Sequence, residues 1–372
     1  MSMRNESGET VPSDIDRRKS DHLDIVLSQG HARRDRATTG LGDIRFEHAA
    51  LPELSLAGID LSVDFLGKRL AAPLLISSMT GGPDRAGRIN TRLAEAAEAL
   101  GIALAVGSQR VALEGRGGGG LDRSLRDLAP SVPLLANIGG AQFVLGYGER
   151  EAMRAVEMIG ADALIVHLNP LQEAVQSGGD TDWRGVLPAI ERLCARLRVP
   201  IVVKEVGSGI SGRIARRLVD AGVSVIDVAG AGGTSWAAVE AERTEDPRRR
   251  AVARLFTDWG IGTARAIADV RTACPSIPLV GSGGVTTGIE VAQAIRCGAD
   301  IVGQAAATLK AADRSTQDVI VHFEDVIETL RIACFCTGSG TIGALARAPL
   351  IDPPAFLGGP RPPDRSVRAD EA

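Results

Sequence analysis

The chain has 372 residues, with 42 Lys and Arg against 46 Asp and Glu, which gives a formal net charge of −4. A chain without excess positive charge is a poor candidate for a nucleic-acid binder that neutralises phosphates. Hydrophobic residues make up 44% and charged residues 24%, which is typical of a globular protein with a large core and excludes a disordered chain. No apolar run reaches the ~18–20 residues that cross a bilayer. The first 22 residues contain no apolar leader core, so we expect a cytoplasmic protein without membrane partners.

Short apolar runs alternate with amphipathic segments from residue 73 onward. Because these runs are apolar almost throughout, they predict strands buried on both faces and therefore a parallel sheet. We expect eight strands, at 74–79, 102–106, 133–137, 163–169, 200–206, 223–228, 278–282 and 299–303. Helical periodicity follows most of them and predicts helices at 88–100, 149–159, 183–197, 211–221, 263–273, 288–297 and 316–334.

Eight strand–helix units in about 260 residues are the number and size of an α/β protein of the (β/α)8 TIM-barrel class. An open, doubly wound sheet is the alternative, although the GxGxxG sequence that marks its dinucleotide site is missing. We expect one barrel domain at 17–351, with poorly ordered tails at 1–16 and 352–372. The long segment 229–262 predicts a lid over the barrel mouth.

Polar residues follow the apolar runs at the carboxyl ends of the predicted strands, where a TIM barrel carries its working groups. The fourth run ends in His167 and Asn169, which period-two alternation places on one face, and continues into Gln172 and Glu173. Each could be a satisfied structural residue, but four at one rim favour a functional site. The neighbouring runs end in Ser77, Ser78, Met79 and Thr80, in Ser108, Gln109 and Arg110, and in Asn137.

Lys204 lies in the fifth apolar run, where a buried ammonium needs an anionic or polar partner. The GSG turn that follows favours a ligand, and the electron-rich edge of a flavin would satisfy the charge. Glycine-rich turns follow the seventh and eighth runs, where barrels bind phosphate. Together these features predict a phosphorylated ligand such as FMN. The basic cluster at 17–19 could close over an anionic substrate.

These motifs resemble those of one family, the flavin-dependent type 2 isopentenyl-diphosphate isomerases. The matching segments, spread over residues 17–305, are RRKSDHLDIVL, PLLISSMTGG, VGSQR, LLANIGG, HLNPLQE, VVKEVGSGIS, AGAGGTSW and GSGGVTTGIEVAQAIRCGADIVG. HLNPLQE with RKSDH is specific to this family, whereas GSGGV is shared by many FMN barrels. The resemblance implies an enzyme that interconverts isopentenyl and dimethylallyl diphosphate in isoprenoid biosynthesis. It also implies FMN, Mg²⁺, NADPH as the reductant of FMN, and a homotetramer or homo-octamer.

The resemblance further implies roles for individual residues. Arg18, Lys19, Ser108, Gln109 and Arg110 would grip the diphosphate. Gln172 would lie at the allylic carbon as part of a catalytic set with His167 and Asn169, and Glu173 would hold Mg²⁺. The flavin would contact Ser78, Met79, Thr80, Ser108, Asn137, Lys204 and Thr234, and its phosphate would lie on Gly284, Val285, Thr286, Ala305 and Ala306.

The sequence departs from the family at Thr286, Ser235 and Ala231, where the family often has Arg, Asn and Arg. These departures affect the expected phosphate and lid contacts and leave HLNPLQE intact. The charged stretch 240–250 has no role in this interpretation.

Two other functions compete with it. One is a flavin barrel that oxidises a small anionic substrate, such as a 2-hydroxy acid oxidase or an inosine-phosphate dehydrogenase-like enzyme. The latter needs a nucleophilic cysteine in a barrel loop, whereas the five cysteines fall in or at the ends of predicted helices or beyond the last strand. Their odd number and the lack of a CxxC pair favour free buried thiols. The other competitor is a non-catalytic scaffold, which would lose the polar strand ends that are all present here.

Overall fold

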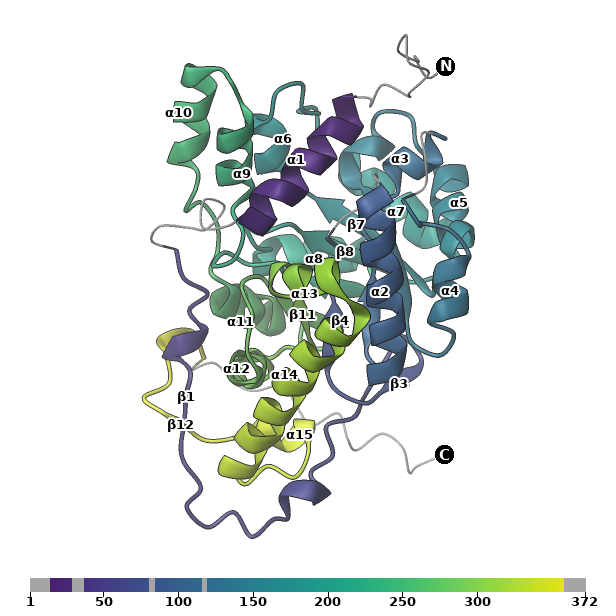
Figure 1. The fold of residues 1–372 in the computed structure, drawn as a ribbon. Coiled ribbons are helices and arrows are strands. Elements are labelled where there is room, and N and C mark those ends of the chain that lie inside the picture. Colours follow the sequence, from purple (N-terminus) through teal and green to yellow (C-terminus); the bar gives the residue numbers. More distant parts are fainter. Residues whose placement is uncertain (1–13, 29–36, 80–83, 116–118, 358–372) are drawn as a thin grey trace.

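The chain forms a closed barrel of eight parallel strands, in the order β10-β11-β4-β5-β6-β7-β8-β9 (Figure 1). The computed structural model describes residues 14–28, 37–79, 84–115 and 119–357. The strands are β4 (Leu74–Ile76), β5 (Ala103–Ala105), β6 (Leu134–Gly139), β7 (Ala163–Leu168), β8 (Ile201–Glu205), β9 (Val225–Asp227), β10 (Leu279–Ser282) and β11 (Ile301–Gln304). Pairing of β11 with β4 closes the barrel. All eight predicted strands and the TIM barrel are therefore confirmed, and the open sheet is wrong.

Helices surround the barrel, and each helix predicted from periodicity is present. They are α2 (Asp84–Leu100), α5 (Glu149–Ile159), α7 (Val186–Arg196), α8 (Gly212–Asp220), α11 (Thr263–Ala273), α12 (Gly288–Cys297) and α14 (Thr316–Cys336). The sequence did not predict α1 (Asp14–Ser28), α3 (Arg110–Leu113), α4 (Ser124–Leu128), α6 (Pro170–Val175), α9 (Trp236–Arg243), α10 (Pro247–Leu255), α13 (Ala306–Arg314) or α15 (Ile342–Leu345). None of the described helices is long and apolar enough to span a membrane.

The segment 229–262 contains two helices, α9 and α10, rather than one long loop. Ser235 caps α9 by accepting a hydrogen bond from the Ala238 N–H at 3.3 Å, and Asp246 caps α10 by accepting one from the Arg248 N–H at 2.9 Å. Pro247 follows that cap at the first position of α10, where its fixed φ suits a helix start. Both starts are visible in the sequence as a capping residue before a helical run.

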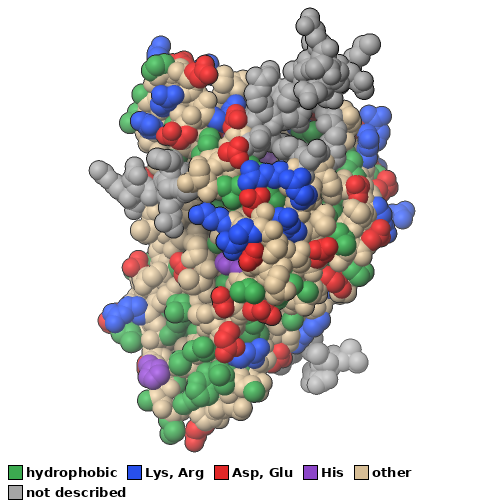
Figure 2. Space-filling view, in the orientation of Figure 1, with side chains coloured by type: hydrophobic (Ala, Val, Ile, Leu, Met, Phe, Trp, Pro, Cys, Tyr) green, Lys and Arg blue, Asp and Glu red, His purple; other side chains and the backbone are tan. Residues whose placement is uncertain are grey.

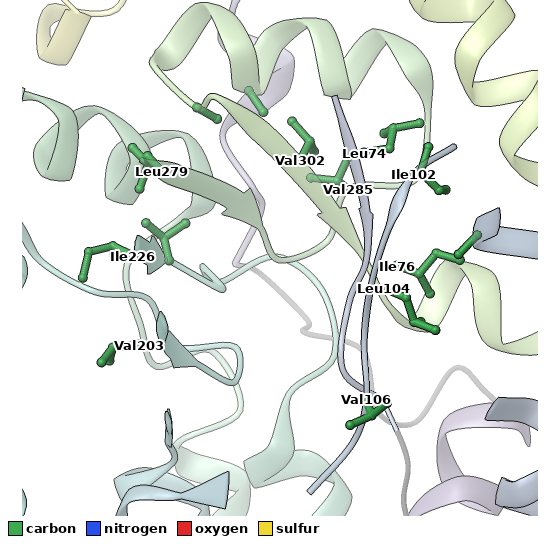
Figure 3. Close-up of a cluster of buried hydrophobic side chains, with 14 of the residues drawn as sticks. Leu74, Ile76, Ile102, Leu104, Val106, Val203, Ile226, Leu279, Val285 and Val302 are labelled. Carbon is green, nitrogen blue, oxygen red and sulfur yellow. The ribbon is translucent and has the colours of Figure 1, made fainter. Parts of the chain in front are cut away.

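Side chains on the strands alternate between the barrel interior and the surrounding helices. The interior layer is made of Leu75, Ala105, Leu135, Ile165, Val202, Val225, Val280 and Ile301. Their neighbours point outward into a second core against the helices, where Figure 3 shows Ile76, Leu104, Val203, Ile226 and Val302. The hairpin of β2 (Val63–Phe65) and β3 (Lys68–Leu70) adds Phe65 and Leu70 to the interior cluster, so this hairpin plugs the amino end of the barrel.

Two similar clamps fasten the amino ends of strands β6 and β10. Arg126 donates to the Gly160 carbonyl at 3.0 Å and to Asp162 at 2.6 Å, while Asp162 also accepts the Leu134 N–H. Arg271 makes the same contacts with the Gly298 carbonyl and Asp300, which accepts the Leu279 N–H. Each clamp arises from a Gly-Ala-Asp sequence that precedes the next strand, at 160–162 before β7 and at 298–300 before β11.

Helix α1 crosses the barrel mouth and contacts α9 and α13 (Figure 1). Arg85 of α2 binds Asp24 of α1 at 2.9 Å and Asp313 of α13 at 2.7 Å. On the side of the molecule that faces the viewer in Figure 1, acidic and basic side chains are interspersed (Figure 2). Strand β1 (Arg45–Phe46) pairs with β12 (Leu350–Ile351) and joins segments from the two ends of the chain. The expected tails at 1–16 and 352–372 lie mostly outside the described residues.

Candidate active site

A polar ring lies one layer above the apolar interior of the barrel. Side chains alternate along a strand, so the residue two positions after each inward-facing apolar residue also faces the barrel interior. The inward positions of this layer are Ser77, Gly107, Asn137, His167, Lys204, Asp227, Ser282 and Gly303. The layer lies at the carboxyl ends of the strands, where TIM-barrel enzymes bind their ligands. The sequence placed Asn137, His167 and Lys204 here but missed Asp227 and Ser282, which the same alternation could have found.

Asn137 and His167 are joined within this ring. His167 Nδ1 lies 2.8 Å from Asn137 Oδ1, and Asn137 Nδ2 donates to the Val106 carbonyl at 3.0 Å. Gln109 supports them from behind, because its Oε1 accepts the Asn137 N–H at 2.9 Å and its Nε2 donates to the Ala155 carbonyl at 2.9 Å. The Gln109 side chain is fully buried between the strands and α5. Both ends of the Gln109 amide thus have partners in the barrel wall, and its contact with the substrate stays a prediction.

Asn169, Gln172 and Glu173 lie together at the start of α6, as the sequence predicted. Asn169 Nδ2 donates to Glu173 Oε1 at 2.9 Å and to Gln172 Oε1 at 3.2 Å. Glu173 is buried, and its second oxygen accepts from Gln176 Nε2 at 2.6 Å and from the Asp180 N–H at 2.7 Å. Three donors thus fix the Glu173 carboxylate and leave part of its acceptor capacity free.

The Glu240 carboxylate connects three separate elements at the mouth, a connection that the sequence did not reveal. It accepts from His22 of α1 at 2.8 Å, from Gln172 of α6 at 3.3 Å, and from Arg243 at 2.7 Å. Burial alone would raise the pKa of Glu240, but the hydrogen bond and charge of His22 and the charge of Arg243 outweigh it and lower that pKa. The His22 ring also packs edge-on against Trp236 at 5.0 Å. Helix α1 is thereby held over the residues of α6.

Arg110 and Glu173 belong to one network through Asp180. Arg110 binds the Asp180 carboxylate at 3.3 Å and Glu114 at 3.0 Å, while the Asp180 N–H binds Glu173. Arg110 therefore lies on the same side of the mouth as Glu173. Ser108, Met79 and Thr234 are half-buried at the rim. Thr80 and the side chains of Arg18 and Lys19 lie outside the described residues.

Lys204 is buried at the mouth, and its Nζ donates to the Glu205 carbonyl at 2.6 Å. The GSG turn after it holds no ligand cradle, which corrects the interpretation of this turn. The Glu205 carboxylate occupies that position, because it accepts the N–H groups of Val206 and Gly207 at 2.7 Å each and also that of Ser208. The same Glu205 lines a cavity of about 10 Å³ with Gln172 and Trp236.

The turns after β10 and β11 present free backbone N–H groups that suit a phosphate. The N–H groups of Gly284 and Val285 have no acceptor among the described residues. Helix α13 begins at Ala306, and its preceding residue Ala305 provides no side-chain cap, so the first N–H groups remain available for an anion. The N–H and the hydroxyl of Thr286 both bind the Glu290 carboxylate, at 2.8 and 2.7 Å, and its contact with the phosphate stays a prediction.

Several buried polar atoms at the mouth lack partners among the described residues. They are Ser77 Oγ, Ser78 Oγ and Asp227 Oδ2. Buried polar atoms are nearly always hydrogen-bonded, so three orphans beside a free helix start indicate a place for a polar ligand. Gly303 keeps this place open, because a Cβ there would clash with Ser77 Oγ and Ser282 Cβ. This mouth, with an ammonium at one side and a phosphate cradle at the other, fits FMN.

None of the five cysteines belongs to the polar ring at the barrel mouth. All five thiols are free, as predicted. Burial raises the pKa of Cys297 to about 12 and that of Cys194 to about 11, so both are protonated at neutral pH. An inosine-phosphate dehydrogenase-like mechanism therefore has no support here.

The fold and site define an FMN-dependent (β/α)8 enzyme. Residues 152–349 match the FMN-dependent dehydrogenase family. A lactate oxidase from Pediococcus acidilactici has the same fold, with a TM-score of 0.64 at 17% identity, covering 95% of this chain and 98% of that one. Such low identity shows the fold alone.

Closer relatives identify the family. The isopentenyl-diphosphate delta-isomerase of Stutzerimonas stutzeri is 64% identical over 335 residues, covering 90% of this chain and 96% of the relative. That of Xanthobacter autotrophicus is 59% identical, covering 90% and 97%. The chain belongs to the isopentenyl-diphosphate delta-isomerase family, in its FMN-dependent, type 2 form.

Proposed function

We propose that this chain interconverts isopentenyl diphosphate and dimethylallyl diphosphate, as a step of isoprenoid biosynthesis, with reduced FMN bound in the barrel mouth. The observation that carries the proposal is the position of Gln172. Its amide is held at both ends, by Asn169 and by Glu240, beside the anchored carboxylate Glu173. Asn169, Gln172 and Glu173 belong to HLNPLQE, the segment that carries the resemblance to the family, whereas Glu240 lies outside it.

Bound reduced FMN would supply a proton donor and acceptor beside the alkene. The chain's own residues bind and orient. The Lys204 ammonium would face the electron-rich edge of the ring, and Ser78, Met79, Thr80, Ser108, Asn137 and Thr234 would contact it. Gly284, Val285, Ala305 and Ala306 would hold its phosphate. Thr286 would contribute little there while Glu290 occupies its N–H.

Gln172 would orient the alkene and, with His167 and Asn169, exclude water from it. An amide is a very poor acid or base in water, so Gln172 relays a proton only in a dry pocket. Gln172 and Glu173 are neighbours in the chain and would contact opposite ends of the substrate. The carbon end would lie at Gln172 and the diphosphate end at Glu173, Arg110, Ser108, Arg18 and Lys19.

Glu173 would hold Mg²⁺ shared with the diphosphate. A bare carboxylate would repel the substrate's negative charges unless a hard cation lay between them. The described residues contain no group of three His, Cys, Asp or Glu side chains that could hold a metal alone, which suits a metal that the substrate helps to bind. Glu173→Gln should weaken activity, and added Mg²⁺ should partly restore it. Full activity of this variant in EDTA would exclude the metal role.

The remaining proposals concern the setting of the reaction. NADPH would reduce the FMN, and the enzyme would act as a homotetramer or homo-octamer, which sedimentation velocity can test. We place it in the cytoplasm because five free thiols suit a reducing compartment.

The decisive experiment is an anaerobic assay of the purified protein with FMN and isopentenyl diphosphate, with and without NADPH or dithionite. We expect bleaching of the flavin and isomerisation only in the reduced sample, because the proposed mechanism takes its proton donor and acceptor from reduced FMN. Full turnover with oxidised FMN would overturn the proposal.

A further inference from the structure

Asp227 is a buried carboxylate to which neither the fold nor the proposed reaction has given a role. It ends β9 and faces the barrel mouth, with 1% of its surface exposed. Oδ1 accepts the Ser282 hydroxyl at 2.5 Å and the Ala229 N–H at 3.2 Å, whereas Oδ2 has no partner among the described residues. A buried carboxylate with an unpaired oxygen is unfavourable unless another positive group offsets it.

The positive group nearest in the barrel wall is Lys204. Lys204 and Asp227 are register partners on the adjacent strands β8 and β9, and both face inward. Their charges attract one another, while the Lys204 ammonium is hydrogen-bonded to the Glu205 carbonyl rather than to Asp227. The mouth therefore holds a buried ammonium and a buried carboxylate side by side, and no direct ion pair with another described residue neutralises either of them.

We propose that Asp227 is a positioning residue that offsets the Lys204 charge and thereby sets the reduction potential of the bound flavin. This inference rests on the proposed function, since it needs FMN in the mouth. A lysine at the electron-rich edge favours the anionic reduced ring and raises the potential, and a carboxylate in the same low-dielectric wall opposes it. The effect of Asp227 on the flavin potential depends on its negative charge. Asparagine is neutral and has nearly the same shape, so it should abolish this effect.

The test measures the midpoint potential of bound FMN at one pH, by reduction against a reference dye, together with FMN affinity. Asp227→Asn should shift the potential to a more positive value and tighten FMN binding a few-fold. Ser282→Ala removes the hydrogen bond but keeps the carboxylate, so it should shift the potential much less. An unchanged or more negative potential in Asp227→Asn would overturn the inference, even if the melting temperature of the variant changes.

Two further variants keep the test decisive. Lys204→Gln should shift the potential to a more negative value, and adding Asp227→Asn to it should move the potential back toward the wild-type value. This double variant removes both buried charges, so it remains informative if Asp227→Asn alone does not fold. Failure of the wild-type protein to bind FMN would instead refute the proposed function, which separates the two outcomes.

Discussion

The two ends of the barrel differ in how completely hydrogen bonds satisfy their acidic side chains. At the amino end, Asp162 accepts hydrogen bonds from Lys68, Arg126 and the Leu134 N–H. Burial raises its pKa, but these three donors lower it further than burial raises it. At the carboxyl end, Asp227 keeps one oxygen without a partner, and burial raises its pKa although Lys204 opposes the shift. At the amino end, which we call the closed end, every oxygen-bound partner of Asp162 comes from the protein and stabilises the fold. At the carboxyl end, the open end, a polar atom without a protein partner among the described residues is available to a ligand.

Breaking a clamp at the closed end should have the largest effect. Arg126→Ala removes a guanidinium that is only 12% exposed and leaves Asp162 without its shortest partner. We expect a loss of about 3 kcal/mol in the free energy of unfolding, measured by urea denaturation. Arg271→Ala should behave alike. The exposed Arg184, paired with Asp182, provides a control that should show no measurable change. An equal loss in the control would contradict the distinction.

At the open end, Gln172→Asn should impair turnover rather than stability. The shorter side chain keeps the amide but moves it by about 1 Å, and such a misplacement lowers kcat by ~10²-fold. FMN affinity should change little. Gln317→Asn, on the exposed face of α14, is the matched control. Near-normal kcat in Gln172→Asn would show that the proton is moved without this amide.

Filling the mouth should weaken cofactor binding and spare the closed end. In Gly303→Ala the new Cβ would meet Ser77 Oγ and lie 2.9 Å from Ser282 Cβ. Overpacking of this kind costs about 1–3 kcal/mol. We expect FMN, titrated by flavin fluorescence, to bind roughly ten-fold more weakly. Gly343→Ala is the control, because its Cβ would only touch Thr341 Oγ1 at 3.9 Å. Unchanged FMN affinity in Gly303→Ala would place the cofactor elsewhere.

The smallest effect is a difference in pH dependence. A carboxylate with a lowered pKa in the folded state stabilises the protein above its unfolded pKa, and that stabilisation is lost as pH falls through the folded pKa. Asp162→Asn should therefore reduce stability most near neutral pH and least in acid. Burial raises the pKa of Asp227, so its charged form is unfavourable in the folded protein. In the FMN-free protein, Asp227→Asn should therefore increase stability near neutral pH. Denaturation of the FMN-free variants at several pH values compares the two ends, and parallel curves would refute the contrast.

The sequence by itself determined the eight strand–helix units, because local periodicity encodes them, whereas periodicity alone did not decide that the sheet closes into a barrel. Runs such as 163–169 and 200–206 are apolar on both faces, and only a parallel sheet covered by helices buries such strands. The polar residues that end these runs also followed from the sequence, since alternation assigns His167 and Lys204 to the inward face. Short helices such as α3 were missed because four residues make only about one turn and give little periodic signal.

Only the tertiary structure decided which partners these polar side chains have. Gln109 follows a strand end in the sequence like the other rim residues, yet its amide is held in the barrel wall by Asn137 and Ala155. Glu240 meets His22 across 218 residues of chain and Gln172 across 68, and Asp227 meets Ser282 across 55. Such contacts depend on which strands and helices become neighbours when the barrel closes, and no local pattern carries that information.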